Sequence, residues 1–175
     1  ENHGLVICAN DVKKALDMTY HVANCLNPKI INKKLEDLKK LYYISKDSCY
    51  RPTIYKNAHQ IAFSEFKIKV ASSGILFPDH LVFLGRKSIV IEKYTDLKTI
   101  MEDIKKSDKL PTIIVPNAGI LVPNNISFEA EELILALSII ISKIPVKAKI
   151  NYLNLEEENE LQKSDAEKYR FNLNK

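Results

Sequence analysis

Glycine is scarce in this sequence, and the positions of the few glycines exclude the common phosphate-binding loops. The four glycines are Gly4, Gly74, Gly85 and Gly119. Neither a GxGxxG nor a Walker pattern can be written around any of them. A GxSxG elbow is absent as well, so nothing in the sequence favours serine hydrolase chemistry. We therefore do not expect nucleotide binding through a glycine-rich loop.

Long apolar runs, cysteine pairs and arginine are also scarce. The longest nearly unbroken apolar run, 133–141, falls far short of the roughly 20 residues that a bilayer requires. Cys8, Cys25 and Cys49 have no CxxC spacing, which argues against a zinc knuckle or a redox pair. Only three of the 26 basic residues are arginine, and no basic stripe alternates with aromatic residues. We therefore expect no nucleic-acid partner, no membrane span and, because no signal segment opens the sequence, a cytoplasmic location.

What the sequence does contain is typical of a soluble globular protein. It has 175 residues, of which 46% are apolar and 27% charged, with a net charge of +4. Apolar runs of strand length alternate with segments of helical periodicity, which predicts an α/β fold with a mixed sheet. The expected strands are 4–9, 81–84, 88–91 and 111–115, with 85–87 as a hairpin turn and 116–119 as a sharp turn. The expected helices are 12–26 with Asn10 or Asp11 as cap, one from about Asn32, one after Pro52, one from Thr95 or Asp96 to 106, 127–144, and one from the Ser164 capping box.

Four histidines are candidates for chemistry, and none forms a local metal motif such as HxH or HExxH. His21 has Asp17 one turn back and is typical of a surface histidine. His80 follows a Pro-Asp turn just before an apolar run, and polar residues at strand ends are where α/β proteins place ligands. Asp79, His80 and Asn117 therefore form a candidate ligand pocket, with capping of backbone donors by Asp79 as the alternative.

The segment Asn2-His3-Gly4-Leu5-Val6, the polar turn after it and Lys14-Ala15-Leu16 resemble the class II aldolase and adducin-head family around its last metal-ligand motif. The segments 77–85, 114–119, 152–153 and 165–169 look like the branch that includes the aldolase part of bifunctional rhamnulose-phosphate aldolase/dehydrogenases. The resemblance implies that His3 binds a divalent metal, zinc in this family, that Asn2 orients His3, and that the metal supports aldol cleavage of a small sugar or sugar-phosphate carbonyl compound.

The resemblance also implies what this chain lacks. The family's upstream His-x-His pair and acidic catalytic residue have no counterpart here, whereas a zinc site needs about three protein ligands. We therefore expect residues 1–72 to be the carboxyl-terminal part of an aldolase-like α/β/α domain and residues 73–175 a small α/β extension. The upstream part of the same protein and further copies of the chain are the expected partners, and the chain alone is expected to be inactive. The alternative is a non-catalytic, adducin-head-like oligomerisation module.

Overall fold

Four short strands form one mixed sheet, and helices cover both of its faces. The computed structural model describes residues 5–26, 37–85, 87–104, 109–164 and 169. Its strands are β1 (Tyr50–Pro52), β2 (Ile89–Val90), β3 (Ile113–Val115) and β4 (Gly119–Pro123). Its α-helices are α1 (Val12–Cys25), α2 (Leu38–Ser45), α3 (Glu65–Ser73), α4 (Tyr94–Ile104), α5 (Phe128–Lys143) and α6 (Leu155–Lys163). A 3-10 helix, η1 (Lys56–Phe63), and a π-helix, η2 (His80–Leu84), complete the elements.

The strand order is β1-β4-β3-β2, with β4 antiparallel to both neighbours and β2 parallel to β3. This arrangement confirms the α/β class and the mixed sheet. Strand β1 comes from residues 1–72 and the other three strands from residues 73–175, so the two expected parts share one sheet. The division at residue 72 itself stays a prediction.

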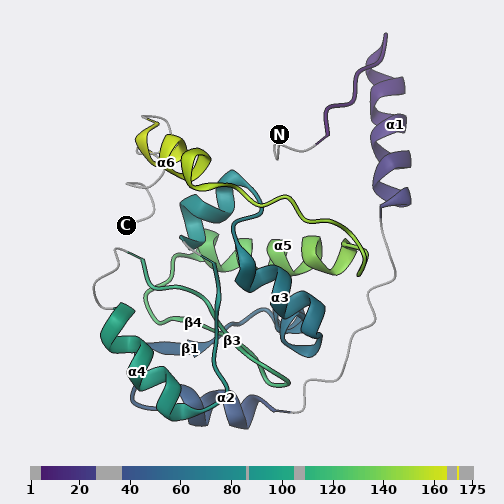
Figure 1. Ribbon diagram of the computed structural model, residues 1–175. Helices are drawn as coiled ribbons and strands as arrows, with labels where there is room; N and C mark the ends of the chain where they lie inside the picture. Colours follow the sequence, from purple (N-terminus) through teal and green to yellow (C-terminus); the bar gives the residue numbers. More distant parts are fainter. Residues whose placement is uncertain (1–4, 27–36, 86, 105–108, 165–168, 170–175) are drawn as a thin grey trace.

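Alternation along β3 and β4 divides the core between the two faces of the sheet. Ile114, Ile120 and Val122 pack against η1, α3 and α5 on one face. Ile113 and Leu121 pack with residues of α2 and α4 on the other face. Figure 1 shows the same layering, with α3 and α5 on one side of the sheet and α2 and α4 on the other. Because both faces are covered, the central strands are apolar at every position, as the sequence suggests for 111–115.

Several helix ends and one turn agree with the sequence. The Asp11 carboxylate accepts a hydrogen bond from the Lys14 backbone N–H at 2.8 Å and caps α1, and Ser127 caps α5 through the Ala130 N–H. The predicted turn at 116–119 joins β3 to β4, with Asn117 at a φ of +58°. Asparagine tolerates this left-handed conformation better than most residues, which explains the tightness of the hairpin.

The expected strands at 4–9 and 81–84 are wrong. Residues 5–9 are irregular, and Leu5 and Val6 are exposed, because no neighbouring strand in the described part of the chain supplies hydrogen bonds. Residues 81–84 belong to η2 and do not form the first strand of a hairpin, and the turn expected at 85–87 includes residue 86, which lies outside the described residues. A short apolar run does not distinguish a buried strand from a buried helical turn by periodicity alone.

Three helix starts also differ from the prediction. Pro52 ends the edge strand β1, where a missing N–H is tolerated, so helical structure begins only at Lys56. Helix α2 begins at Leu38 behind the cap Asp37, and residues 32–36 lie outside the described part. Helix α4 begins at Tyr94, since the Asp96 carboxylate accepts the backbone N–H groups of residues 92 and 93 instead of capping a later start.

The last described helix precedes the one expected from the Ser164 capping box. Asn154 and Glu157 form the capping box of α6, and Ser164 follows the end of that helix. The Ser164 N–H donates to the carbonyl oxygens of Glu160 and Leu161, which makes it a carboxyl-terminal cap. Most of the segment that was expected to be helical, 165–168 and 170–175, lies outside the described residues.

Candidate functional site

The residues expected to bind metal lie outside the described part of the chain. Asn2 and His3 belong to the segment 1–4, so the structure does not place them. Within the described ranges, no three His, Cys, Asp or Glu side chains come together as metal ligands. A catalytic zinc site needs about three protein ligands, and the described residues do not form one. The assignment of His3 and Asn2 therefore stays a prediction.

His80 is fully buried at the start of η2, which packs against α5. Its Nδ1 accepts a hydrogen bond of 3.4 Å from the Leu76 backbone N–H, and its ring lies 5.8 Å from that of Phe77. Burial lowers the pKa of His80 to about 4, so the imidazole is neutral at pH 7. Asp79 is half-buried, and its side chain makes no cap hydrogen bond to η2. Capping of other backbone donors by Asp79 stays a prediction.

Asn117 stands in a different setting from His80. It is exposed in the β3–β4 turn, and its backbone N–H donates to the carbonyl oxygen of Ala62 in η1 at 2.9 Å. Asn117 is thus held by the backbone contacts of a tight turn. His80 is instead buried in the part of the core that packs against α5. A shared ligand pocket of Asp79, His80 and Asn117 stays a prediction.

A buried polar cluster that the sequence did not suggest joins β1 to α5. The Glu131 carboxylate, almost fully buried, accepts two hydrogen bonds from the Arg51 guanidinium, at 2.9 and 2.6 Å. It also accepts the Thr53 hydroxyl at 2.8 Å and the Ile54 backbone N–H at 2.9 Å. A bidentate pair of this kind is among the strongest hydrogen-bonded arrangements in proteins. Four donors on the β1–η1 segment therefore converge on one carboxylate of α5.

His59 extends the same region toward the β3–β4 hairpin. Its Nδ1 accepts the Ile120 backbone N–H at 3.0 Å, so the ring proton resides on Nε2, which donates to the Thr53 carbonyl oxygen at 3.2 Å. Burial lowers the pKa of His59 more than the bond to Thr53 raises it. Both ring nitrogens are thus engaged with backbone in the neutral form. A Cβ at Gly119 would lie 2.3 Å from this ring, which explains why the hairpin needs glycine there.

The electrostatics of the cluster are those of a structural connection. Burial alone would raise the pKa of Glu131, but the bonds from Arg51, Ile54 and Thr53 and the Arg51 charge lower it below 4.5. The hydrogen bond to Glu131 in turn raises the pKa of the Arg51 guanidinium. Among the described residues, no buried side-chain nitrogen or oxygen lacks a partner. With every donor and acceptor occupied, the cluster fixes β1 and η1 on α5.

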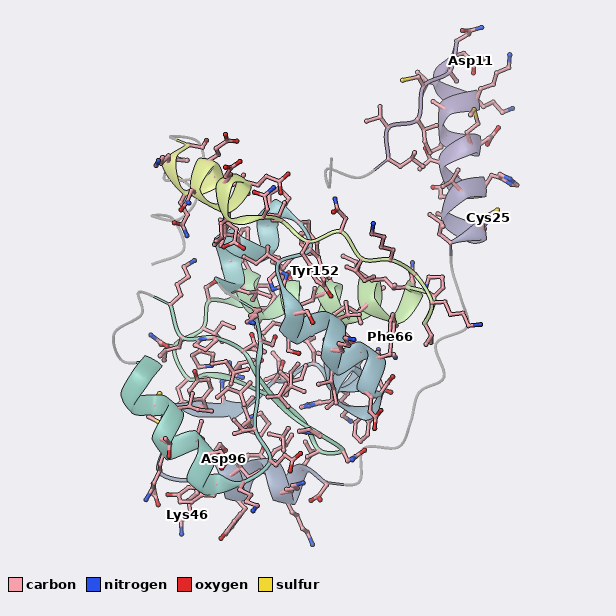
Figure 2. The ribbon with its side chains drawn as sticks, viewed as in Figure 1. Asp11, Cys25, Lys46, Phe66, Asp96 and Tyr152 are labelled. Carbon is pink, nitrogen blue, oxygen red and sulfur yellow. The ribbon has the colours of Figure 1, made fainter. Side chains whose placement is uncertain are left out.

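The segment 5–26 has the opposite character, since it is largely exposed. No residue of α1 is buried, and Figure 1 shows α1 apart from the other elements. Val12 is 85% and Leu16 50% exposed, and Leu5, Val6, Tyr20 and Leu26 are exposed as well. His21 is exposed, as expected of a surface histidine, and lies beside Cys25, with 3.8 Å between its Nε2 and the Cys25 Sγ. In Figure 2, Asp11 and Cys25 mark the two ends of this helix.

A scan against models of protein families gave no match, and searches of curated proteins and of solved structures gave none either. In the described part of the chain, no helix combines the length and the apolar character needed to cross a bilayer.

Proposed function

We propose that the chain is the carboxyl-terminal portion of a metal-dependent class II aldolase-like lyase that acts on a small sugar or sugar-phosphate carbonyl compound. The proposal rests on the family resemblance around His3 and on one structural observation, the exposed apolar surface of segment 5–26. The described residues of this chain form no metal centre by themselves. Its role in the lyase is to contribute His3, oriented by Asn2, to a site completed by a His-x-His pair on further polypeptide.

The local structure of segment 5–26 is consistent with a role as part of a larger aldolase-like domain. The polar turn that the resemblance places after the metal-ligand motif contains Asp11, which caps α1. Four apolar side chains on either side of that turn are exposed, namely Leu5, Val6, Val12 and Leu16. Apolar side chains gathered on one exposed helix and its approach mark an interaction surface. In the proposal, this surface packs on the aldolase-like sheet, and 5–9 becomes a strand at its edge.

The test compares this chain with the same chain joined to the residues encoded before Glu1. Zinc content and aldol cleavage of a sugar phosphate are measured on both proteins, with a His3→Ala variant of the longer one. We expect turnover, and zinc that is retained after dialysis, only in the longer protein, and loss of both in His3→Ala. Turnover by the short chain alone, or a longer protein whose activity survives His3→Ala, would refute the proposal.

Replacing Leu16 examines the packing surface separately. Leu16→Asp should weaken activity in the longer protein by disturbing the packing of α1, while Lys14→Asp, on the polar side of the same helix, serves as the matched control. Equal activity of the two variants would show that the exposed stripe of α1 is not a packing surface.

The adducin-head-like alternative has one observation in its favour. Helix α5 is largely apolar from Leu133 to Ile141, and Phe128 and Ile140 remain exposed although Ile134 and Leu137 are buried in the core. Exposed apolar side chains on one helix are typical of a subunit contact. Sedimentation equilibrium distinguishes the two functions: a stable homo-oligomer without bound metal or turnover, in the longer protein as well, favours the module.

A further inference from the structure

His21 and Cys25 form a pair of metal-ligating side chains outside every site considered above. They lie one turn apart on α1, and both are exposed. The His21 Nε2 and the Cys25 Sγ approach to 3.8 Å, which places the two donor atoms side by side. Two ligands four residues apart on one helix are also the arrangement by which the HExxH motif presents its histidines to zinc.

The distance between the donor atoms matches the geometry of zinc. Zinc binds imidazole nitrogen at about 2.0–2.1 Å and thiolate sulfur at about 2.3 Å, and prefers tetrahedral coordination. At the tetrahedral angle of about 109°, these bond lengths separate nitrogen and sulfur by roughly 3.6 Å. The observed separation is 3.8 Å, so side-chain shifts of a few tenths of an ångström would admit the ion. We propose that His21 and Cys25 form a two-ligand site for a divalent cation of the zinc class.

The chemistry of binding needs no oxidant and no change of backbone. The neutral imidazole donates the Nε2 lone pair, the thiol releases its proton to solvent as sulfur bonds to the metal, and waters occupy the remaining positions. Thiolate and imidazole together favour Zn²⁺, Co²⁺ and Cu²⁺ over Mg²⁺ and Ca²⁺, which prefer oxygen ligands. Because both side chains are exposed, ion and water reach the site from bulk solvent.

The other histidines described in the structure offer no comparable site. In His59 and His80, Nδ1 already accepts a backbone N–H, and both rings are buried. Cys8 is as exposed as Cys25 and therefore supplies a matched control for the thiol. His3 supplies the second control, because the proposed lyase function assigns it a metal ligand role of its own.

Titration of the reduced chain with Co²⁺ under a phosphine reductant tests the site, followed by competition with Zn²⁺ against a chromogenic chelator. We expect one ion per pair and a thiolate-to-cobalt charge-transfer absorption. Cys25→Ser should abolish that absorption. His21→Ala and Cys25→Ser should each weaken binding by at least the ~10-fold that loss of an outer-shell partner costs at other metal sites. Because α1 contains no buried residue, neither substitution should change the circular dichroism of the folded protein.

The controls decide between this site and the others. Cys8→Ser and His3→Ala should bind Co²⁺ as the unmodified chain does. If His21→Ala and Cys25→Ser bind like the unmodified chain, the contact is only a weak hydrogen bond and the proposal fails. If His3→Ala abolishes binding, the ion belongs to His3 and the proposal fails as well, while the proposed lyase function gains support.

Discussion

Removing the Glu131 carboxylate is the sharpest test of how this fold is held together. The substitution Glu131→Ala removes the acceptor of four hydrogen bonds that join β1 and the following turn to α5. The Glu131 side chain is 4% exposed, whereas that of its partner Arg51 is 34% exposed. After the substitution, Arg51 can turn toward water, but the Thr53 hydroxyl and the Ile54 N–H remain without their acceptor.

The size of the effect follows from these exposures. Breaking a buried ion pair by removing one partner costs about 3–5 kcal/mol, and each stranded donor costs about 1–3 kcal/mol. Because Arg51 is partly exposed, we expect the lower end, about 3 kcal/mol for Glu131→Ala. Glu131→Gln keeps an amide oxygen for Thr53 and Ile54 but loses the charge and the acceptor for Arg51 Nη2, so we expect roughly 1–2 kcal/mol for it.

Urea unfolding followed by circular dichroism measures both values, with an unchanged m-value as evidence that only stability differs. In thermal unfolding, about 3 kcal/mol corresponds to a Tm roughly 6–12 °C lower for a chain of this size. Glu132→Ala is the matched control, because Glu132 is the next residue of α5, is exposed and accepts only a 3.4 Å bond from Tyr55. That variant should lie within about 0.5 kcal/mol of the unmodified protein.

The pH dependence provides a second check on the same residue. The folded-state pKa of Glu131 lies below its ordinary value of 4.5, because the hydrogen bonds and the Arg51 charge outweigh burial. A depressed pKa contributes stability above the ordinary value, and this contribution is lost as the pH falls through the folded value. The difference in free energy of unfolding between the unmodified chain and Glu131→Ala should therefore be largest at pH 7 and should become smaller as the pH falls below 4.5. A Glu131→Ala variant as stable as Glu132→Ala at pH 7 would refute the reasoning.

Three further substitutions probe other parts of the core. Gly119→Ala places a Cβ 2.3 Å from His59 Nδ1 at a φ of +149°, so its urea midpoint should fall below that of Gly85→Ala, whose nearest contact is at 3.3 Å; equal midpoints would contradict the proposed clash. Burial depresses the pKa of His80 from 6.5 to about 4, so the stability that the neutral ring contributes is complete above pH 6.5 and should be lost as the pH falls toward 4. In His80→Gln, the free energy of unfolding should therefore fall less between pH 6.5 and pH 4 than in the unmodified protein. Ser127→Ala removes the cap of α5 and should lower the free energy of unfolding by about 1 kcal/mol in urea, and an unchanged value would mean that water replaces the cap.

Local signals in the sequence predicted much of the secondary structure correctly. Asp11 and Ser127 were identifiable as caps because a short polar side chain stands just before a run of helical periodicity. The strand at 113–115 was identifiable because a buried central strand is apolar at every position, and Pro-Asn-Ala-Gly after it marks a turn. These features depend on residues within a few positions of one another, so periodicity and turn chemistry are enough to predict them.

Where the sequence misled, the deciding partner lay far away in the chain or outside the described part. Residues 5–9 have the composition of a strand, but a strand forms only beside another strand. Residues 81–84 have the same apolar composition, and their contact with α5, some 50 residues later, favours a buried helical turn. Strand β4 was missed altogether, because only pairing with β1 and β3 distinguishes it from the end of a turn.

Glu131 shows why the buried cluster could not be found from sequence alone. An acidic residue in the first turn of a helix is favourable on a solvated surface, because its negative charge interacts favourably with the helix dipole, and Glu129 and Glu131 look alike in this respect. What distinguishes Glu131 is the antiparallel pairing of β1 with β4, which brings Arg51 and Thr53 beneath α5. The sheet register thus converts one of two similar glutamates into a buried anion with four donors. A pairing across about 80 residues leaves no local pattern in the sequence. Loss of stability on substitution of Glu131, but not of Glu132, would show that this long-range pairing exists.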